Sequence, residues 1–228
     1  MIVDTMSYAE VANNMLSAYK GCTERIASLL VNNNNKYRRI ILKNCGRCNF
    51  KSLMIKVDNI MFYIYPYSLS KSDYKKNGLL YSVVGKVYYK NNNIWCFMPN
   101  FFDDCIILTH HFFERYNERH LDNEFEMVND ELVRRYFVET DFKCVIDYNY
   151  RGSDNNEVTV NTNIGQCCGK VISNNCLLMK TFIDLNTIRN GCKNNSIVKT
   201  KDNLLMLMNK TKTIEEDSFN FYKSYMAS

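Results

Sequence analysis

Residues 109–139 read THHFFERYNERHLDNEFEMVNDELVRRYFVE, and they separate two groups of short, β-rich segments. Apolar residues recur at helical spacing over 109–120, and Thr109 is a suitable N-cap for this segment. The pattern breaks at Asp122 and resumes, which predicts two successive helices. Helices between groups of strands are typical of the α+β class.

The flanking segments predict mostly antiparallel strands separated by turn-prone residues. The segments before the helices are YRRIILK (37–43), SLMIKVD (52–58), IMFYIYPYSL (60–69), LLYSVVGKVYYK (79–90) and IWCFMP (94–99). Those after the helices are FKCVIDYN (142–149), EVTVNTN (157–163), QCCGKVIS (166–173) and CLLMKTFID (176–184). Pro66 restricts its strand to a sheet edge or to a strand end.

The chain begins and closes with predicted helices. Residues 6–33 have a helical pattern that predicts an αα-hairpin or a kinked helix, and the asparagine run at 32–35 is expected to end it. Apolar residues at 204–208 predict a closing helix. We therefore expect a single α+β body over 1–228: N-terminal helices plus an antiparallel sheet, then two helices followed by a second antiparallel sheet. If the body is divided, the regions are 1–100 and 101–228.

Composition bounds the class of protein without naming its function. The 228 residues are 46% hydrophobic with 8 Gly and 2 Pro, which excludes a wholly disordered or collagen-like chain. A net charge of +5 permits an RNA or DNA partner without requiring one. No secretory signal and no apolar run long enough to span a membrane is visible, so we expect a cytoplasmic protein whose ten cysteines are reduced.

Cys45 and Cys48 have the C-x₂-C spacing of half a zinc site. No second pair stands at a suitable distance, so we predict a turn with incidental thiols and no bound metal. No P-loop, G-x-G-x-x-G or G-x-S-x-G pattern occurs either, and we predict no cofactor.

His111, Arg115 and Arg119 are spaced by four residues, so they form a ladder along the predicted helix. A solvated charged face is one interpretation. However, Arg115 with Arg119 and Glu114 with Glu118 are like-charged pairs, which a face built for stability avoids. Arginine matches phosphate oxygens, and histidine exchanges a proton near neutral pH. The ladder therefore suggests metal-free RNA cleavage, with His111 as acid or base and two arginines as a clamp.

THHFFERYNER, residues 109–119, resembles the S-x-H-A-x-x-R-x-x-x-R helix of the BrnT-like ribonuclease toxins. The later GQCCGKVISNNCLLMKTF resembles the β-hairpin of those proteins, ending here in Lys180, Thr181 and Phe182. The resemblance covers roughly residues 105–185 and implies a RelE-like α+β core with ribonuclease activity. It places Thr109, His111, Arg115 and Arg119 on the family's pattern, and we take His111, Arg115 and Arg119 as the candidate catalytic residues. Phe112 replaces the usual small residue after the histidine.

Lysines and arginines also gather in KYRRIILKNCGRCNFK, residues 36–51. A strand pair with a basic turn would contact phosphates, whereas a solvated hairpin is the alternative. The predicted RNA-binding residues are Arg38, Arg39, Lys43, Arg47 and Lys180.

The leading hypothesis is an RNA-binding protein that, if it is an enzyme, is a metal-independent endoribonuclease of toxin-like type. Its partners would be RNA and a protein such as an antitoxin or a phage component. The alternative is a non-enzymatic structural or interaction protein of a phage or other mobile element. Tyr63, Tyr65 and Tyr67 alternate along one strand, which would then be covered on both faces or offer a tyrosine platform to the partner.

Overall fold

The structure of the chain is a computed structural model. It describes residues 1–99, 105–142, 144–147, 157–173, 176–185 and 187. The helices are α1 (Tyr8–Lys43), α2 (Lys71–Asn77), α3 (His110–His120) and α4 (Asp130–Glu139). The strands are β1 (Cys48–Asn49), β2 (Leu53–Val57), β3 (Ile60–Ser68), β4 (Leu80–Tyr89), β5 (Asn93–Pro99), β6 (Cys105–Leu108), β7 (Val145–Asp147), β8 (Glu157–Asn161), β9 (Gly165–Ser173) and β10 (Cys176–Asp184).

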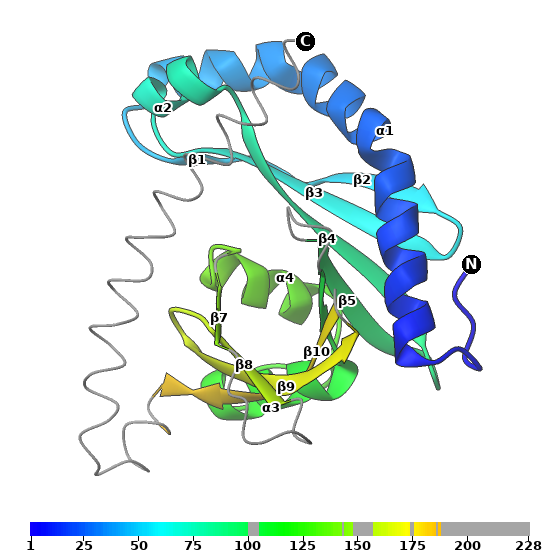
Figure 1. The fold of residues 1–228 in the computed structure, drawn as a ribbon. Coiled ribbons are helices and arrows are strands. Elements are labelled where there is room, and N and C mark those ends of the chain that lie inside the picture. The colour runs from blue at the N-terminus through cyan, green and yellow to red at the C-terminus, as the bar shows by residue number, and fades with distance from the viewer. Residues whose placement is uncertain (100–104, 143, 148–156, 174–175, 186, 188–228) are drawn as a thin grey trace.

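One mostly antiparallel sheet runs through both halves of the chain (Figure 1). Its order is β1-β3-β4-β5-β6-β10-β9-β8-β7, and β2 also pairs with β3. The exception to antiparallel pairing is β6 with β10, which are parallel and adjacent. A parallel pair needs a long crossover, and the chain between these strands supplies α3, α4 and β7–β9. The α+β class is confirmed.

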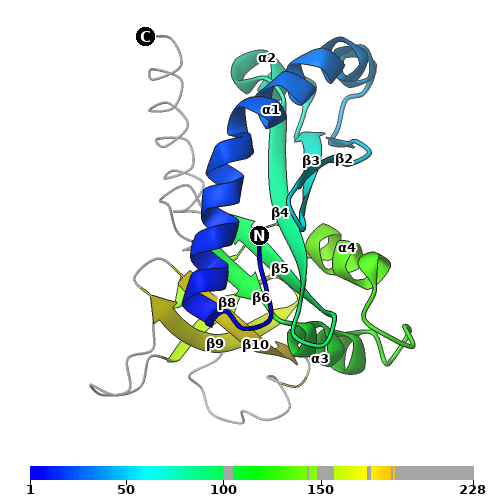
Figure 2. The same cartoon turned by 90° about the vertical axis from the view of Figure 1, so that its right-hand side faces the viewer.

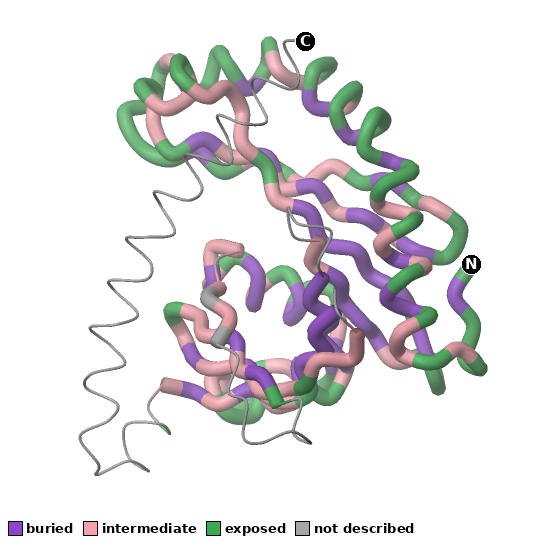
Figure 3. The backbone as a smooth tube through the Cα atoms, viewed as in Figure 1, coloured by how far each residue is buried: buried purple, intermediate pink, exposed green. Residues whose placement is uncertain are grey.

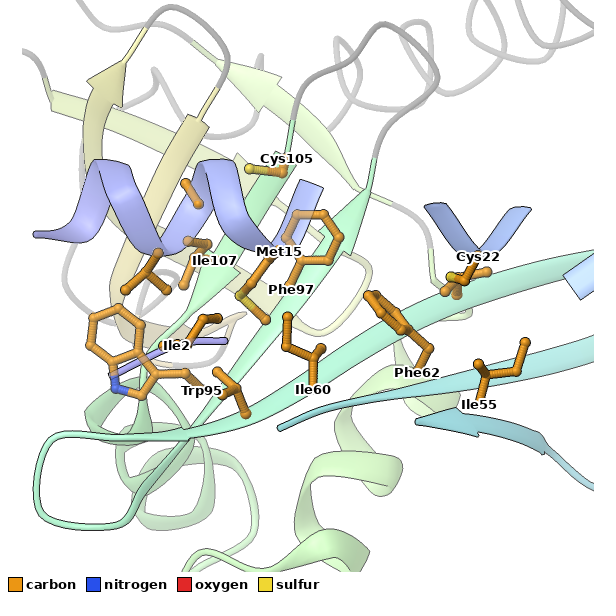
Figure 4. Packing of buried hydrophobic residues seen from close by; sticks show 14 of the residues in the cluster. Ile2, Met15, Cys22, Ile55, Ile60, Phe62, Trp95, Phe97, Cys105 and Ile107 are labelled. Atoms are coloured by element: carbon orange, nitrogen blue, oxygen red, sulfur yellow. The ribbon is translucent and has the colours of Figure 1, made fainter. Parts of the chain in front are cut away.

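Helices cover opposite faces of this sheet. Figures 1 and 2 show α1 on one side of β3 and β4 and α4 on the other. Met15 and Cys22 of α1 pack over Phe62 and Phe97 on the first face (Figure 4). Phe112 of α3 belongs to the core on the second face.

The central strands are buried on both faces (Figure 3). Val83 belongs to the core under α1, whereas its neighbour Val84 belongs to the core under α3 and α4. In β10, Leu178 belongs to the core under α1 and its neighbour Leu177 belongs to the core under α3 and α4. This double burial explains why several strands are continuous apolar runs rather than alternating sequences.

The predicted helix over 109–120 is confirmed. The Thr109 side chain accepts a hydrogen bond from the Phe112 backbone N–H, so it caps the helix as expected. Phe112 and Tyr116 are fully buried and meet Phe182 of β10 edge to face, with ring centroids 5.9 and 5.4 Å apart. The chain then turns at Asp122 and Asn123, both with positive φ.

The prediction that the asparagine run ends the first helix is wrong. A single helix, α1, continues through it to Lys43 and includes the predicted strand 37–43. Tyr37 and Ile41 are the reason, because both are buried in a small core with Phe50 and Tyr74. This tertiary burial outweighs the low helix propensity of asparagine.

The position of Pro66 was also predicted wrongly, because β3 is an internal strand. Pro66 lies where the pairing of β3 passes from β2 to β1. Its carbonyl accepts a hydrogen bond from the Phe50 N–H, whereas the Pro66 nitrogen has no proton to donate in return.

Three short elements were not predicted: β1, β6 and α2, the last lying in a segment expected to be a turn. The predicted closing helix at 204–208 lies outside the described residues. Within the described part of the chain, no helix is long and apolar enough to cross a membrane.

Candidate nucleic-acid interface

The His-Arg ladder lies on the solvent-facing side of α3. The Arg115 Nε donates to His111 Nε2 at 3.4 Å, and His111 Nδ1 lies 2.9 Å from Glu114 Oε2. Arg115 also forms an ion pair with Glu118. The structure thus brings His111 and Arg115 together, but each also has a carboxylate partner on the same helix.

Among the described residues, Arg119 does not interact with His111 or Arg115 but has a different partner. Its Nη1 donates to the backbone carbonyl of Phe182 in β10 at 2.6 Å. This bond connects the end of α3 to β10, which is the second strand of the β9–β10 hairpin. Arg115 and Arg119 thus have different partners, Glu118 and the Phe182 carbonyl, and the predicted phosphate clamp remains a prediction.

The other two histidines of α3 have structural partners. The Ile94 backbone N–H donates to His110 Nδ1 at 3.2 Å, and burial lowers the pKa of His110. His120 Nδ1 lies 2.6 Å from Asp184 Oδ1, and its Nε2 lies 3.4 Å from Glu139 Oε2. These contacts hold both rings against the sheet and α4.

Glu139 is the centre of a polar network between α3 and α4. The Tyr116 hydroxyl donates to Glu139 Oε2, and Arg135 Nε donates to Oε1. Burial alone would raise the pKa of Glu139, but these two hydrogen bonds and the positive charge of Arg135 together outweigh burial and lower it. The network gives the polar atoms of Tyr116 and Arg135 a hydrogen-bond partner, which is a structural role.

A second region of interest lies at the end of α1. The chain from 25 to 57 contains no aspartate or glutamate, although it holds eight lysines and arginines. Lys36, Arg39 and Lys43 follow the spacing i, i+3, i+7, so they share the solvent side of α1. Within the described residues, they take part in none of the ion pairs.

The helix α2 adds further cations beside this end of α1. The Tyr74 hydroxyl of α2 donates to Asn34 Oδ1 of α1 at 2.9 Å. Arg38 follows Asn34 by one helical turn, so it lies on the side of α1 that faces α2. We call the resulting surface the basic end; its residues are Lys36, Arg38, Arg39, Lys43, Lys71, Lys75 and Lys76, all exposed.

Two predicted RNA-binding residues, Arg47 and Lys180, are not counted in the basic end. Arg47 forms an ion pair with Asp141, and its guanidinium carbon lies 5.0 Å from the centre of the Tyr67 ring. Lys180 is exposed on β10. β10 packs against α3. Figures 1 and 2 show α3 at the opposite end of the molecule from α2.

The cations of α2 were missed because the segment 71–78 was predicted as a turn. Ser70 and Asp73 carried the missing signal: a serine three residues before an acid is an N-cap pattern. In the structure Ser70 Oγ accepts from the Asp73 backbone N–H at 3.0 Å, and Gly78 ends the helix with φ +79°. Lys71 and Lys75 then stand one turn apart.

The tyrosines of β3 face the C-terminal half rather than forming a free platform. The Tyr63 hydroxyl donates to Asp130 Oδ2 at 3.3 Å. The Tyr65 ring packs on Phe142, with centroids 4.9 Å apart. The first of the two predicted situations, a strand covered on both faces, therefore applies to Tyr65.

The cysteines do not assemble into a metal site in the described part of the chain. Cys45 is exposed whereas Cys48 is buried, so the two thiols occupy different environments. Among the described residues, no three His, Cys, Asp or Glu side chains are grouped closely enough to hold a metal ion. Burial raises the pKa of Cys96 and Cys167, which makes these thiols inert core residues.

Comparison of the chain with protein-family models, with curated proteins and with solved structures found no match. The fold and the surface chemistry described above are therefore the basis for a functional proposal.

Proposed function

We propose that this chain is an RNA-binding protein that contacts the phosphate backbone through its basic end. The observation that carries the proposal is the charge of this surface: exposed lysines and arginines of α1 and α2 stand together. The acid of α2, Asp73, accepts a hydrogen bond from Asn77 within the helix. Clustered cations on one surface are the usual electrostatic basis of nucleic-acid binding.

The α3 segment favours RNA over DNA as the partner. Its resemblance to ribonuclease toxins supports RNA, and α3 carries a histidine beside an arginine on an open surface. Cleavage of bound RNA at His111 and Arg115 is a second proposal. It is the weaker one, because the Arg115 N–H occupies the Nε2 lone pair that a general base would use.

The binding proposal is tested by fluorescence anisotropy with a labelled single-stranded RNA. Substituting Arg38, Arg39 and Lys43 together by Glu reverses three charges of the basic end and should weaken RNA binding strongly. If each of the three contacts one phosphate, the slope of log K against log salt should become shallower by about 2. Lys180→Glu is the matched control for the single variant Arg39→Glu, since Lys180 is an exposed cation on β10, and it should leave affinity nearly unchanged.

Equal weakening by Lys180→Glu and Arg39→Glu would contradict the location of the interface. Absence of RNA binding by the folded wild type would reject the proposal and favour a protein-interaction role. A DNA strand of the same sequence tests the choice of nucleic acid, because only RNA offers the 2′-hydroxyl as a contact. Incubating RNA in excess EDTA and looking for 2′,3′-cyclic ends tests cleavage separately.

A further inference from the structure

An open hollow of about 410 Å³ lies between the loop after α1 and the first turns of α2. Its lining consists of Cys45, Ser70, Lys71, Ser72 and Lys75. This volume falls in the range of roughly 300–1,000 Å³ that is common for small-ligand sites. The hollow is shallow and open to solvent, so it offers contacts to a small anionic group without enclosing it.

The polar groups that line the hollow are donors. Lys71 and Lys75 are one helical turn apart, so both ammonium groups lie on the same side of α2. Ser70 Oγ already accepts from the Asp73 N–H, which leaves the hydroxyl proton of Ser70 available to donate. Two like charges at this spacing repel each other, and an anion between them would remove that cost.

No carboxylate is among the residues that line the hollow. Asp73 belongs to the same turn of α2, but its Oδ1 accepts from Asn77 Nδ2 at 2.9 Å. Its Oδ2 is buried without a hydrogen-bond partner and does not line the hollow. The lining thus combines two positive charges with hydroxyl donors, which suits a doubly charged anion.

We propose that this hollow binds a phosphate monoester, and, resting on the proposed function, that its source is the terminal phosphate of a bound RNA. A monoester carries close to two negative charges near neutral pH and three acceptor oxygens, which matches two lysines and two serines. A bridging phosphodiester carries only one charge. Lysine binds phosphate as a point charge, so the site needs no fixed fork geometry.

The hollow lies at the border of the basic end, where the terminal phosphate of a bound RNA could reach it. Cys45 follows the last residue of α1, Lys43, by two positions, and α2 packs on α1 through Tyr74 and Asn34. An RNA strand on the basic end therefore has a hollow with matching charge at its border.

Cys45 supplies a direct readout, because its thiol is exposed and lines the hollow. The rate at which iodoacetamide alkylates Cys45 is measured by peptide mass spectrometry, with adenosine 5′-monophosphate or with adenosine present. We expect the monophosphate to slow alkylation and adenosine to have little effect. Lys71→Gln with Lys75→Gln should abolish the protection, whereas Lys76→Gln, on the same helix but outside the lining, should retain it.

The RNA source is tested by comparing strands that carry a 5′-phosphate, a 3′-phosphate or hydroxyls at both ends. A terminal phosphate should tighten wild-type binding by roughly three- to tenfold, because two exposed ion pairs are each worth little. This gain should disappear in the Lys71→Gln, Lys75→Gln variant. RNA binding that ignores the terminal phosphate, with Cys45 unprotected, would overturn this inference and leave the proposed function standing.

The converse result is equally informative. If the monophosphate protects Cys45 but no RNA binds, the hollow is a phosphate-monoester site for a free nucleotide and the RNA-binding proposal fails. Equal effects of adenosine and its monophosphate on alkylation would overturn the assignment of a phosphate site.

Discussion

The ammonium of Lys86 in β4 lies 2.6 Å from Oδ1 of Asp130 at the start of α4, although 44 positions separate the two residues. The Lys86 side chain is 7% exposed and that of Asp130 is 58% exposed. Burial alone would lower the pKa of Lys86, but the hydrogen bond with Asp130 and the negative charge of that carboxylate, with smaller contributions from Tyr63 and Tyr88, together outweigh burial and raise it. This ion pair joins the first part of the sheet to the helix that covers it.

Asp130→Ala should destabilise the protein by about 1.5–3 kcal/mol, because it leaves a buried ammonium without its charged partner. Lys86→Met should cost less, since it removes the buried charge and leaves Asp130 in solvent. Urea denaturation measures both free energies of unfolding. Glu131→Ala is the control, because Glu131 is also an exposed acid in the first turn of α4. A larger loss from Lys86→Met than from Asp130→Ala would contradict this account.

Arg119 and Arg115 should differ in their contribution to stability. Arg119→Ala should cost about 1–2 kcal/mol, because it removes a hydrogen bond to the Phe182 carbonyl that connects α3 to β10. Arg115→Ala should cost under about 1 kcal/mol, since its ion pair with Glu118 lies on the surface. Thermal or urea unfolding of the two variants checks this order, and equal losses would show that the Arg119 contact contributes nothing.

Gly169 of β9 should not tolerate a side chain. A Cβ at this position would lie 2.0 Å from the carbonyl oxygen of Leu178 in β10, so the two strands would have to separate. We expect Gly169→Ala to destabilise by about 3 kcal/mol or more. At Gly46 a Cβ would meet no atom within 4 Å, and Gly46→Ala should change stability by under about 0.5 kcal/mol. Similar effects at both glycines would contradict the close approach of β9 and β10.

Stability should fall in alkaline solution, and Tyr65 should contribute to the loss. Burial raises the pKa of Tyr65 to about 12, above the value of about 10 expected in the unfolded chain. Between these values the unfolded state loses the Tyr65 proton and the folded state keeps it, so unfolding becomes more favourable as pH rises. The raised pKa of Lys86 has the same effect on stability. The folded protein becomes less stable as the pH rises above the pKa that Lys86 has in the unfolded chain.

Tyr65→Phe should therefore lose less stability than the wild type between pH 10 and 12. Urea denaturation at several pH values measures the slope, and the free energies at pH 7 serve as the reference. An identical alkaline slope in the variant would show that the Tyr65 hydroxyl is not desolvated in the folded state.

The sequence by itself determined most strands and the helix at 109–120. These elements depend on local information: the alternation of side chains along a strand, the helical spacing of Phe112 and Tyr116, and the Thr109 cap. The turn at Asp122 was predictable for the same reason, since short polar residues accept a positive φ. The charge of the segment after residue 25 was also visible in the sequence alone.

Only the tertiary structure decided how far α1 extends and where the functional groups meet. The asparagine run is helical because Tyr37 and Ile41 bury themselves beyond it and because Asn34 accepts a hydrogen bond from Tyr74, forty positions away. The hydrogen bond of Arg119 with the Phe182 carbonyl and the hollow that Cys45 and Lys71 both line likewise involve distant segments of the chain. Spacing within one segment carries no information about such contacts, because they form only when packing brings separate elements together.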